Sequence, residues 1–187
     1  MSETDFEKRV VEMLKAQFAA LRDSAAARRA GDIKAEDDAG SRLVQTDREI
    51  TTLLKSEELR LKMLLKPPAD ADADTRVAQL LMAFRQGAKL ERVWHDLLGD
   101  SKAASRVAKR AQKVIPLLDA IGDGRRTALT CFLDDKDADV RASAAAALLK
   151  FMPERTVPIL EEISRNGKWL SAGNTAMVNL IMYRSGV

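Results

Sequence analysis

The stretch Leu133–Leu149, with the sequence LDDKDADVRASAAAALL, decides the fold class. Its aspartates form an acidic turn that favours the start of a helix, because carboxylates accept hydrogen bonds from the free amides of a first helical turn. Asp139 is expected to cap this helix and attract Arg141, and Val140 is expected to enter the core. The alanines let neighbouring helices approach closely. The stretch therefore predicts a helix over Ala138–Phe151 that packs against other helices.

The composition of the whole chain agrees with an all-α fold. Of 187 residues, 46% are hydrophobic but only 4% are aromatic, and there are 9 glycines and 5 prolines. Few residues are β-branched, and alanine, leucine and arginine are abundant, which favours helices over hairpins of strands. We predict a long helical hairpin that continues into a short α-solenoid or bundle, as one elongated unit or two closely packed ones.

The first 66 residues predict the hairpin. An apolar stripe at steps of three or four predicts the first helix, up to about Ala26, and a second helix is expected over Ile33–Leu64. Gly31 and Asp32 separate the two helices, and two prolines stop the second. Intrachain packing is favoured over pairing with a second copy, which stays open. The expected stripe is Phe6, Val10, Leu14, Phe18, Leu21 and Ala25.

Glycines, prolines and acidic turns divide the rest of the chain into shorter helices. Gly87 is expected to break one of them, Pro116 to kink or split another near Val114, and Pro158 to delay the start of a third. The predicted domains are a hairpin over 1–66, connecting helices over 67–98 and a helical-repeat domain over 99–187. The predicted helices cover Thr75–Arg85, Lys89–Leu98, Ser101–Ile121, Arg125–Leu133, Ala138–Phe151, Glu154–Ser164 and Leu170–Tyr183.

Two short motifs occur twice. Gly31-Asp32-Ile33-Lys34-Ala35 is similar to Gly99-Asp100-Ser101-Lys102-Ala103, and Asp72-Ala73-Asp74-Thr75-Arg76 is similar to Asp137-Ala138-Asp139-Val140-Arg141. Their offsets, 68 and 65 residues, agree within a short deletion. They are explained either by a duplicated multi-helix unit or by coincidence in a chain rich in Ala, Asp and Arg.

The stretch Leu133–Leu149 resembles the second half of a HEAT-like repeat, in which an acidic turn precedes Val-Arg, small residues and a leucine pair. Residues 94–186 are similar to an uncharacterised family of small bacterial HEAT-like domains. The resemblance implies an α-solenoid surface that binds a partner and no particular chemistry. Small HEAT-like proteins also serve as immunity-type inhibitors of toxins, so the resemblance implies such a role as one option.

The charge distribution suggests where a partner binds. The net charge is +3, but residues 101–187 alone carry 14 basic and 9 acidic side chains. We expect a non-catalytic adaptor, inhibitor or assembly component that binds an acidic protein partner. The alternative is a nucleic-acid-binding helical-repeat protein that uses the same stripe. The candidate partner-binding residues are Lys102, Arg106, Lys109, Arg110 and Lys113 on one helix, with Arg125 and Arg126 from the following turn.

The sequence argues against catalytic, cofactor and metal sites. With one histidine and one cysteine, the chain has no pair of imidazoles and no cysteine-rich zinc site. The two Asp-x-Asp-x-Asp runs lack the glycine and glutamate of a calcium loop, so helix capping explains them better. Asp96 is not expected to orient His95, because adjacent helical side chains point about 100° apart. Cys131 is expected to be a buried core thiol, and Trp94 and Trp169 core anchors.

A cytoplasmic location is expected. The segment Met1–Asp5 is acidic and leads into an amphipathic helix, which is unlike a signal peptide. No run approaches the 18 or so apolar residues of a membrane span. Membrane association is therefore not expected.

Overall fold

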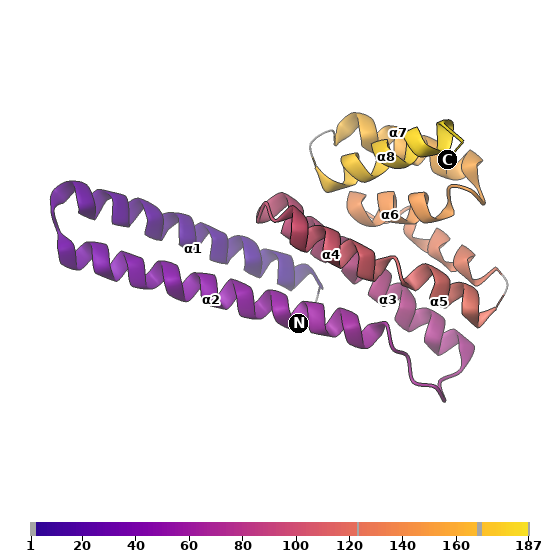
Figure 1. Cartoon of the computed structure of the whole chain (residues 1–187), viewed down its shortest axis with the longest axis horizontal. Helices are drawn as coiled ribbons and strands as arrows, with labels where there is room; N and C mark the ends of the chain where they lie inside the picture. The colour runs from indigo at the N-terminus through magenta and orange to yellow at the C-terminus, as the bar shows by residue number, and fades with distance from the viewer. Residues whose placement is uncertain (1–2, 123, 168–169, 187) are drawn as a thin grey trace. The chain divides into compact units, whose positions relative to one another are not determined.

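The computed structural model describes residues 3–122, 124–167 and 170–186. Helices occupy most of these residues, and no strand occurs among them (Figure 1). The prediction of an all-α fold is therefore confirmed. The chain divides into two compact units, Met1–Leu59 and Arg60–Val187, with the boundary inside the second long helix. Within the described residues, no helix combines the length and the apolar character that crossing a bilayer requires.

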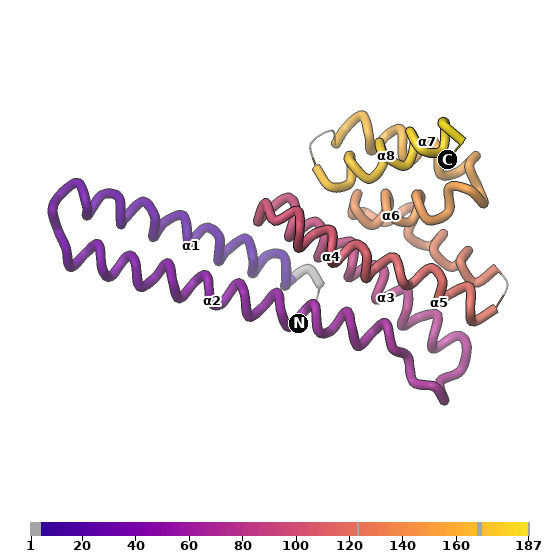
Figure 2. The backbone as a smooth tube through the Cα atoms, viewed as in Figure 1, coloured from indigo at the N-terminus to yellow at the C-terminus, as the bar shows by residue number. Residues whose placement is uncertain are grey.

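The first unit is a helical hairpin made of α1 (Glu3–Ala30) and the greater part of α2 (Ile33–Leu64). Gly31 turns the chain with a positive φ of 72°, and the Asp32 carboxylate accepts a hydrogen bond from the Ala35 amide at 3.0 Å. Two ion pairs, Arg28–Glu36 at 2.7 Å and Arg42–Asp23 at 2.9 Å, join the helices across the turn. The helices therefore run antiparallel, as Figure 2 shows.

The predicted apolar stripe of α1 is correct only over its first two turns. Phe18 and Leu21 are 66% and 49% exposed. The buried positions fall at steps of four, three, seven and seven, a period of 3.5 residues that suits the seam between two helices. The predicted stripe drifts off this seam after its second residue. The buried side chains of α1 are Phe6, Val10, Met13, Ala20 and Ala27.

The second unit begins with a long helix, α3 (Ala73–Arg92), which ends in the π-helical turn η1 (Val93–Leu97). The helices α4 (Ser101–Ala111) and α5 (Val114–Ile121) pack against α3. A 3-10 helix, η2 (Arg125–Phe132), stands where an α-helix over Arg125–Leu133 was predicted. Three further helices pack on one another: α6 (Ala138–Leu148), α7 (Pro153–Asn166) and α8 (Ser171–Arg184) (Figure 1).

Gly87 does not break α3, so the predicted gap between two short helices is wrong. The glycine is buried inside the continuous helix, where α4 crosses it. A Cβ atom at Gly87 would lie 2.3 Å from the Ala111 Cβ atom, far closer than two carbons can approach. Gly87 therefore serves close helix packing, and its conformational freedom is not needed.

The two internal prolines behave differently. The split predicted near Val114 is confirmed, because α4 ends at Ala111 and α5 begins at Val114. The prediction that Pro158 delays the next helix is wrong. Pro153 starts α7 instead, since its fixed φ suits the first helical position, and Pro158 lies inside the helix.

Each copy of the two repeated motifs forms a helix N-cap. The carboxylate of Asp100 accepts a hydrogen bond from the Ala103 amide at 2.9 Å, as Asp32 does from Ala35. Asp72 accepts from the Thr75 amide at 2.8 Å, and Asp137 accepts from the amide of Asp139 at 3.0 Å. Capping of helices by these acidic turns is therefore confirmed, and the shared capping chemistry explains why the motifs look alike.

The predicted roles inside Leu133–Leu149 are partly correct. Val140 is completely buried, and the leucine pair and three of the six alanines of this stretch are buried as well. Asp139 does not cap α6, because the cap is Asp137, two residues earlier. Arg141 donates instead to the Asp135 carbonyl oxygen at 2.7 Å. Because Asp137 caps the helix, the Asp139 carboxylate is free to accept a hydrogen bond from the Ser171 hydroxyl.

Cys131 is exposed, so the prediction of a buried core thiol is wrong. The prediction assumed an α-helical period around Ala128, Leu129 and Phe132. The segment forms a 3-10 helix with three residues per turn, in which Leu129 is buried and Cys131 faces outward.

Candidate functional site

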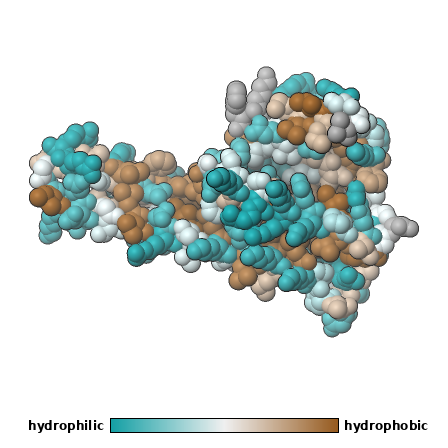
Figure 3. All heavy atoms as spheres, in the orientation of Figure 1, coloured by the Kyte–Doolittle hydropathy of each residue, from teal (hydrophilic) through white to brown (hydrophobic). Residues whose placement is uncertain are grey.

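The basic surface lies on α4 and on the turn that follows it, in the unit Arg60–Val187. The helix contains no acidic residue, and its inner face is buried through small side chains such as Ala104 and Val107. The structure brings five of the seven predicted partner-binding residues together around a shallow depression of about 590 Å³, which Ser101 and Ser105 also line. Figure 3 shows hydrophilic side chains gathered over α4. These five residues are Lys102, Arg106, Lys109, Arg110 and Lys113.

An apolar depression adjoins this surface. Its volume is about 490 Å³, and Arg110 and Lys113 line both depressions. Its remaining lining comes from the end of α2 and from α5. Gln79 of α3 fixes the end of α2 by donating to the Leu64 carbonyl oxygen at 3.1 Å. The residues that complete the lining are Lys62, Leu65, Lys66, Pro116 and Leu117.

Arg125 and Arg126 lie on η2 and line neither depression. Arg125 pairs with Asp74 at 3.0 Å. Arg126 pairs with Asp119 through two nitrogens, and its guanidinium carbon lies 4.6 Å from the centre of the Phe151 ring. Both side chains thus have partners inside the chain, and neither lies with the five residues that surround the basic depression.

His95 and Asp96 are in direct contact, contrary to the sequence-based expectation. The His95 Nδ1 and Asp96 Oδ1 atoms lie 2.6 Å apart. The reason is the π-helical turn, whose wider winding turns successive side chains by less than the 100° of an α-helix. Asp96 also accepts a hydrogen bond from the Ser171 amide at 3.0 Å, so it connects η1 to the start of α8.

Asp139 continues this network into the core. The Ser171 hydroxyl donates to Asp139, and Arg92 lies 3.8 Å from the same carboxylate. Burial raises the pKa of Asp139 to about 6, with Asp137 and Asp96 adding to the rise and Ser171 and Arg92 opposing it. The Asp96–Ser171–Asp139 contacts therefore join η1, α6 and α8, and no serine of the described residues forms a hydrogen bond with His95.

Two arginines of α3 neutralise the acidic turn before α6. Arg85 lies 3.3 Å from the Asp135 carboxylate, and Arg92 lies 3.1 Å from that of Asp137. These pairs join residues about fifty positions apart, so the local Asp-x-Asp-x-Asp pattern gave no sign of them. The turn is thus a structural connection between α3 and α6.

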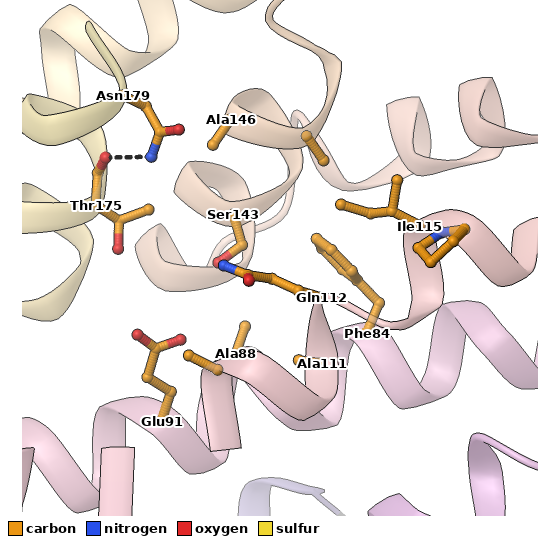
Figure 4. A pocket seen from close by; sticks show the side chains of 13 residues that line it. Phe84, Ala88, Glu91, Ala111, Gln112, Ile115, Ser143, Ala146, Thr175 and Asn179 are labelled. Carbon is orange, nitrogen blue, oxygen red and sulfur yellow. Dashed lines mark hydrogen bonds between the residues drawn. The ribbon is translucent and has the colours of Figure 1, made fainter. Parts of the chain in front are cut away.

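A second hollow, of about 360 Å³, lies between α3, α4, α6 and α8, with α5 at one end. Glu91 reaches into it from α3, and its carboxylate points toward the space beside Thr175 of α8 (Figure 4). Burial raises the pKa of Glu91 to about 7; Asp139 and Asp96 add to the rise, and His95 opposes it. Sequence reasoning missed this group, because its surroundings come from four separate segments.

The two tryptophans were predicted to be core anchors. Trp94 is half-buried, and its indole nitrogen is buried without a hydrogen-bond partner among the described residues. Trp169 lies outside the described residues.

No protein family, curated protein or solved structure matches the chain. The HEAT-like resemblance of Leu133–Leu149 accordingly stays a prediction, and the candidate site is interpreted from its own geometry.

Proposed function

We propose that this protein is a non-catalytic binding module that holds an acidic, partly apolar segment of another protein on the α4 surface. The observation that supports this proposal is the union of five basic side chains with an adjoining apolar depression in one unit. Adaptor, inhibitor and assembly roles all use such a surface, and an immunity-type inhibitor is among them. A bacterial cytoplasmic setting is part of the proposal and rests on the sequence alone.

Three lysines of this surface are available to a partner. Lys102, Lys109 and Lys113 are exposed and form no ion pair with the described residues. Lys102 and Lys109, seven residues apart, lie on one face of α4, and Lys113 follows in the turn before α5. A row of like charges without internal counter-ions attracts a surface of the opposite sign and accelerates encounter with it.

The apolar depression favours protein over nucleic acid as the partner. Leu65, Pro116 and Leu117 line it together with four basic side chains. A protein segment can place an apolar side chain on the apolar residues and its carboxylates on the basic ones, which matches the apolar centre and polar rim of protein interfaces. The phosphate backbone of a nucleic acid would contact only the basic side chains and would leave Leu65 and Leu117 exposed to water.

Charge reversal at two lysines tests the proposal. The variant Lys109→Glu/Lys113→Glu alters exposed side chains without described ion pairs, and Lys136→Glu/Lys150→Glu makes the same charge change elsewhere in the unit. The probe is a helical peptide of about 20 residues, rich in glutamate with leucines on one face. We expect binding by the parent chain, a loss of about tenfold or more in the first variant and a change within about twofold in the second.

Two further probes separate the alternatives. A peptide in which serine replaces the leucines should bind more weakly, because the apolar lining stays uncovered. Duplex DNA should bind weakly even at low salt. Strong salt-dependent binding of DNA that the Lys109→Glu/Lys113→Glu variant abolishes, without binding of the peptide, would establish the nucleic-acid alternative instead.

A further inference from the structure

The hollow between α3, α4, α6 and α8 has a feature that packing alone does not explain. Five alanines line it, and their small side chains leave about 360 Å³ open inside an otherwise close-packed unit. That volume lies at the lower end of the range for small-molecule sites. The alanines are Ala88, Ala108, Ala111, Ala146 and Ala147.

The Glu91 carboxylate faces this space without a partner. Its side chain is half-buried, and it forms no hydrogen bond or ion pair with the described residues. The neighbouring buried carboxylates differ, since Asp96 is bound by Ser171 and His95, and Asp139 by Ser171. Partial removal of a carboxylate from water without a compensating partner costs free energy, so a cation or a hydrogen-bond donor in the hollow would stabilise the Glu91 carboxylate.

The charges around Glu91 favour a cation. Asp139 of α6 and Asp96 of η1 act on it as negative charges, and His95 of η1 is the opposing positive group when protonated. The residues that α4, α5 and α8 contribute to the lining are uncharged. A positively charged group beside Glu91 would therefore relieve repulsion among three carboxylates as well as desolvation of one.

Polar and apolar groups flank the carboxylate on opposite sides. The Asn179 side-chain nitrogen donates to the Thr175 carbonyl oxygen at 2.8 Å, which leaves its oxygen as an acceptor (Figure 4). The hydroxyl of Ser143 is a further acceptor in the lining. Phe84 and Ile115 supply hydrocarbon at the other side of the hollow (Figure 4).

We propose that this hollow binds a small organic cation whose ammonium or guanidinium group pairs with the Glu91 carboxylate. Its remaining N–H groups donate to the Asn179 and Ser143 oxygens, and its hydrocarbon part covers Phe84 and Ile115. A single carboxylate suffices for one such group, whereas Mg²⁺ or Ca²⁺ needs several oxygen ligands. The proposal does not depend on the basic surface of α4, which lies on the other face of that helix. The cation is either a free amine or the side chain of a lysine or arginine in a peptide.

Titration of the full chain tests the proposal. The probes are agmatine and n-butylammonium, the neutral n-butanol, and a capped tripeptide with a central arginine, followed by amide NMR shifts. We expect saturable binding of at least one cation and binding of n-butanol that is weaker by about tenfold or more. Preference for agmatine over the tripeptide would identify a free small molecule, and the opposite preference a peptide side chain.

Two variants locate the binding. Glu91→Gln keeps the shape of the side chain and removes its charge, and it should weaken cation binding about tenfold or more. Ala146→Leu keeps the charge and fills the hollow, with the same expected loss. Glu154→Gln, which removes an exposed carboxylate on α7, should change the affinity by less than about twofold.

The pH dependence of cation binding provides an independent test. A cation competes with the proton on Glu91, so binding should weaken from pH 8 to pH 6, and calorimetry in buffers of different ionisation enthalpy should detect proton release at pH 7. No saturable shift with any cation at about 10 mM would overturn the proposal. Unchanged binding by Glu91→Gln would overturn it as well.

Discussion

The Glu91 carboxylate loses water in the folded chain and gains no described hydrogen bond in return, and this imbalance has a measurable consequence for stability. Its pKa rises from 4.5 to about 7. The folded state therefore holds a proton between these two pH values that the unfolded state has lost, so the free energy of unfolding falls as pH rises through this window.

The variant Glu91→Gln should be free of this penalty, because its side chain is neutral at every pH. We expect it to exceed the parent chain in free energy of unfolding by about 3 kcal/mol at pH 8. The difference should shrink as pH falls below 7 and disappear near pH 4.5. Urea denaturation across this range measures both curves. Glu162→Gln, an exposed change on α7, should show no such trend, and a Glu91→Gln variant less stable than its parent at pH 8 would contradict the argument.

Single residues also show where sequence reasoning ends. The acidic turns were predictable as capping segments, because a cap depends on amides three residues away or fewer, although the cap of α6 was assigned to Asp139 and is Asp137. Gly87 was misread as a break, since its reason is Ala111, which belongs to another helix. No local pattern distinguishes a glycine that ends a helix from one that lets a second helix approach.

Among the elements, α6 depends most clearly on one cap. Asp137 accepts from the amides of Asp139 and Val140, and it also pairs with Arg92 of α3. Asp137→Ala should lower the free energy of unfolding by about 1–3 kcal/mol, because it removes the cap and leaves a half-buried arginine with one carboxylate fewer. Thermal or urea denaturation provides the measurement.

Asp134→Ala is the matched control for the same turn. Asp134 is exposed and forms no contact with the described residues, so the change should stay within about 0.5 kcal/mol. Equal losses from the two substitutions would show that the cap and the Arg92 pair contribute nothing specific to α6.

The elements of the candidate site were predictable to different degrees. The basic face of α4 follows from helical spacing, which can be read from the sequence, and five of the seven proposed partner-binding residues share one surface. The 3-10 helix η2 and the π-helical turn η1 were not predictable, and both errors about Cys131 and His95 come from assuming α-helical winding there. The hollow around Glu91 needs four elements to converge, which spacing along the chain does not reveal.

For the molecule as a whole, the two units differ in how much apolar side-chain surface they bury. Between residues 15 and 49 of the hairpin, the buried side chains are Ala20, Ala27 and Ala39, whereas α6 buries Val140 and Leu148 completely. Alanine removes little apolar surface from water. We expect amides of residues 15–49 to exchange hydrogen about 100-fold faster than those of α6, measured by mass spectrometry of peptic fragments.

Hydrogen exchange measured at two protein concentrations distinguishes protection by the hairpin itself from protection by self-association. Slow exchange in residues 15–49 at high concentration only would show that a second copy covers the exposed Phe18 and Leu21. Exchange as slow as that of α6 at every concentration would contradict the expectation, because three buried alanines do not supply such protection.

The outward position of Cys131 makes the chain ready for site-specific chemistry. It is the one cysteine of the sequence, so a maleimide dye has a single thiol to modify and no engineered residue is needed. Partial desolvation raises the pKa of this thiol, which slows labelling at neutral pH and favours a reaction at about pH 8.5. A fluorophore on η2 would then report ligand titrations in a chain that carries no amino-acid substitution.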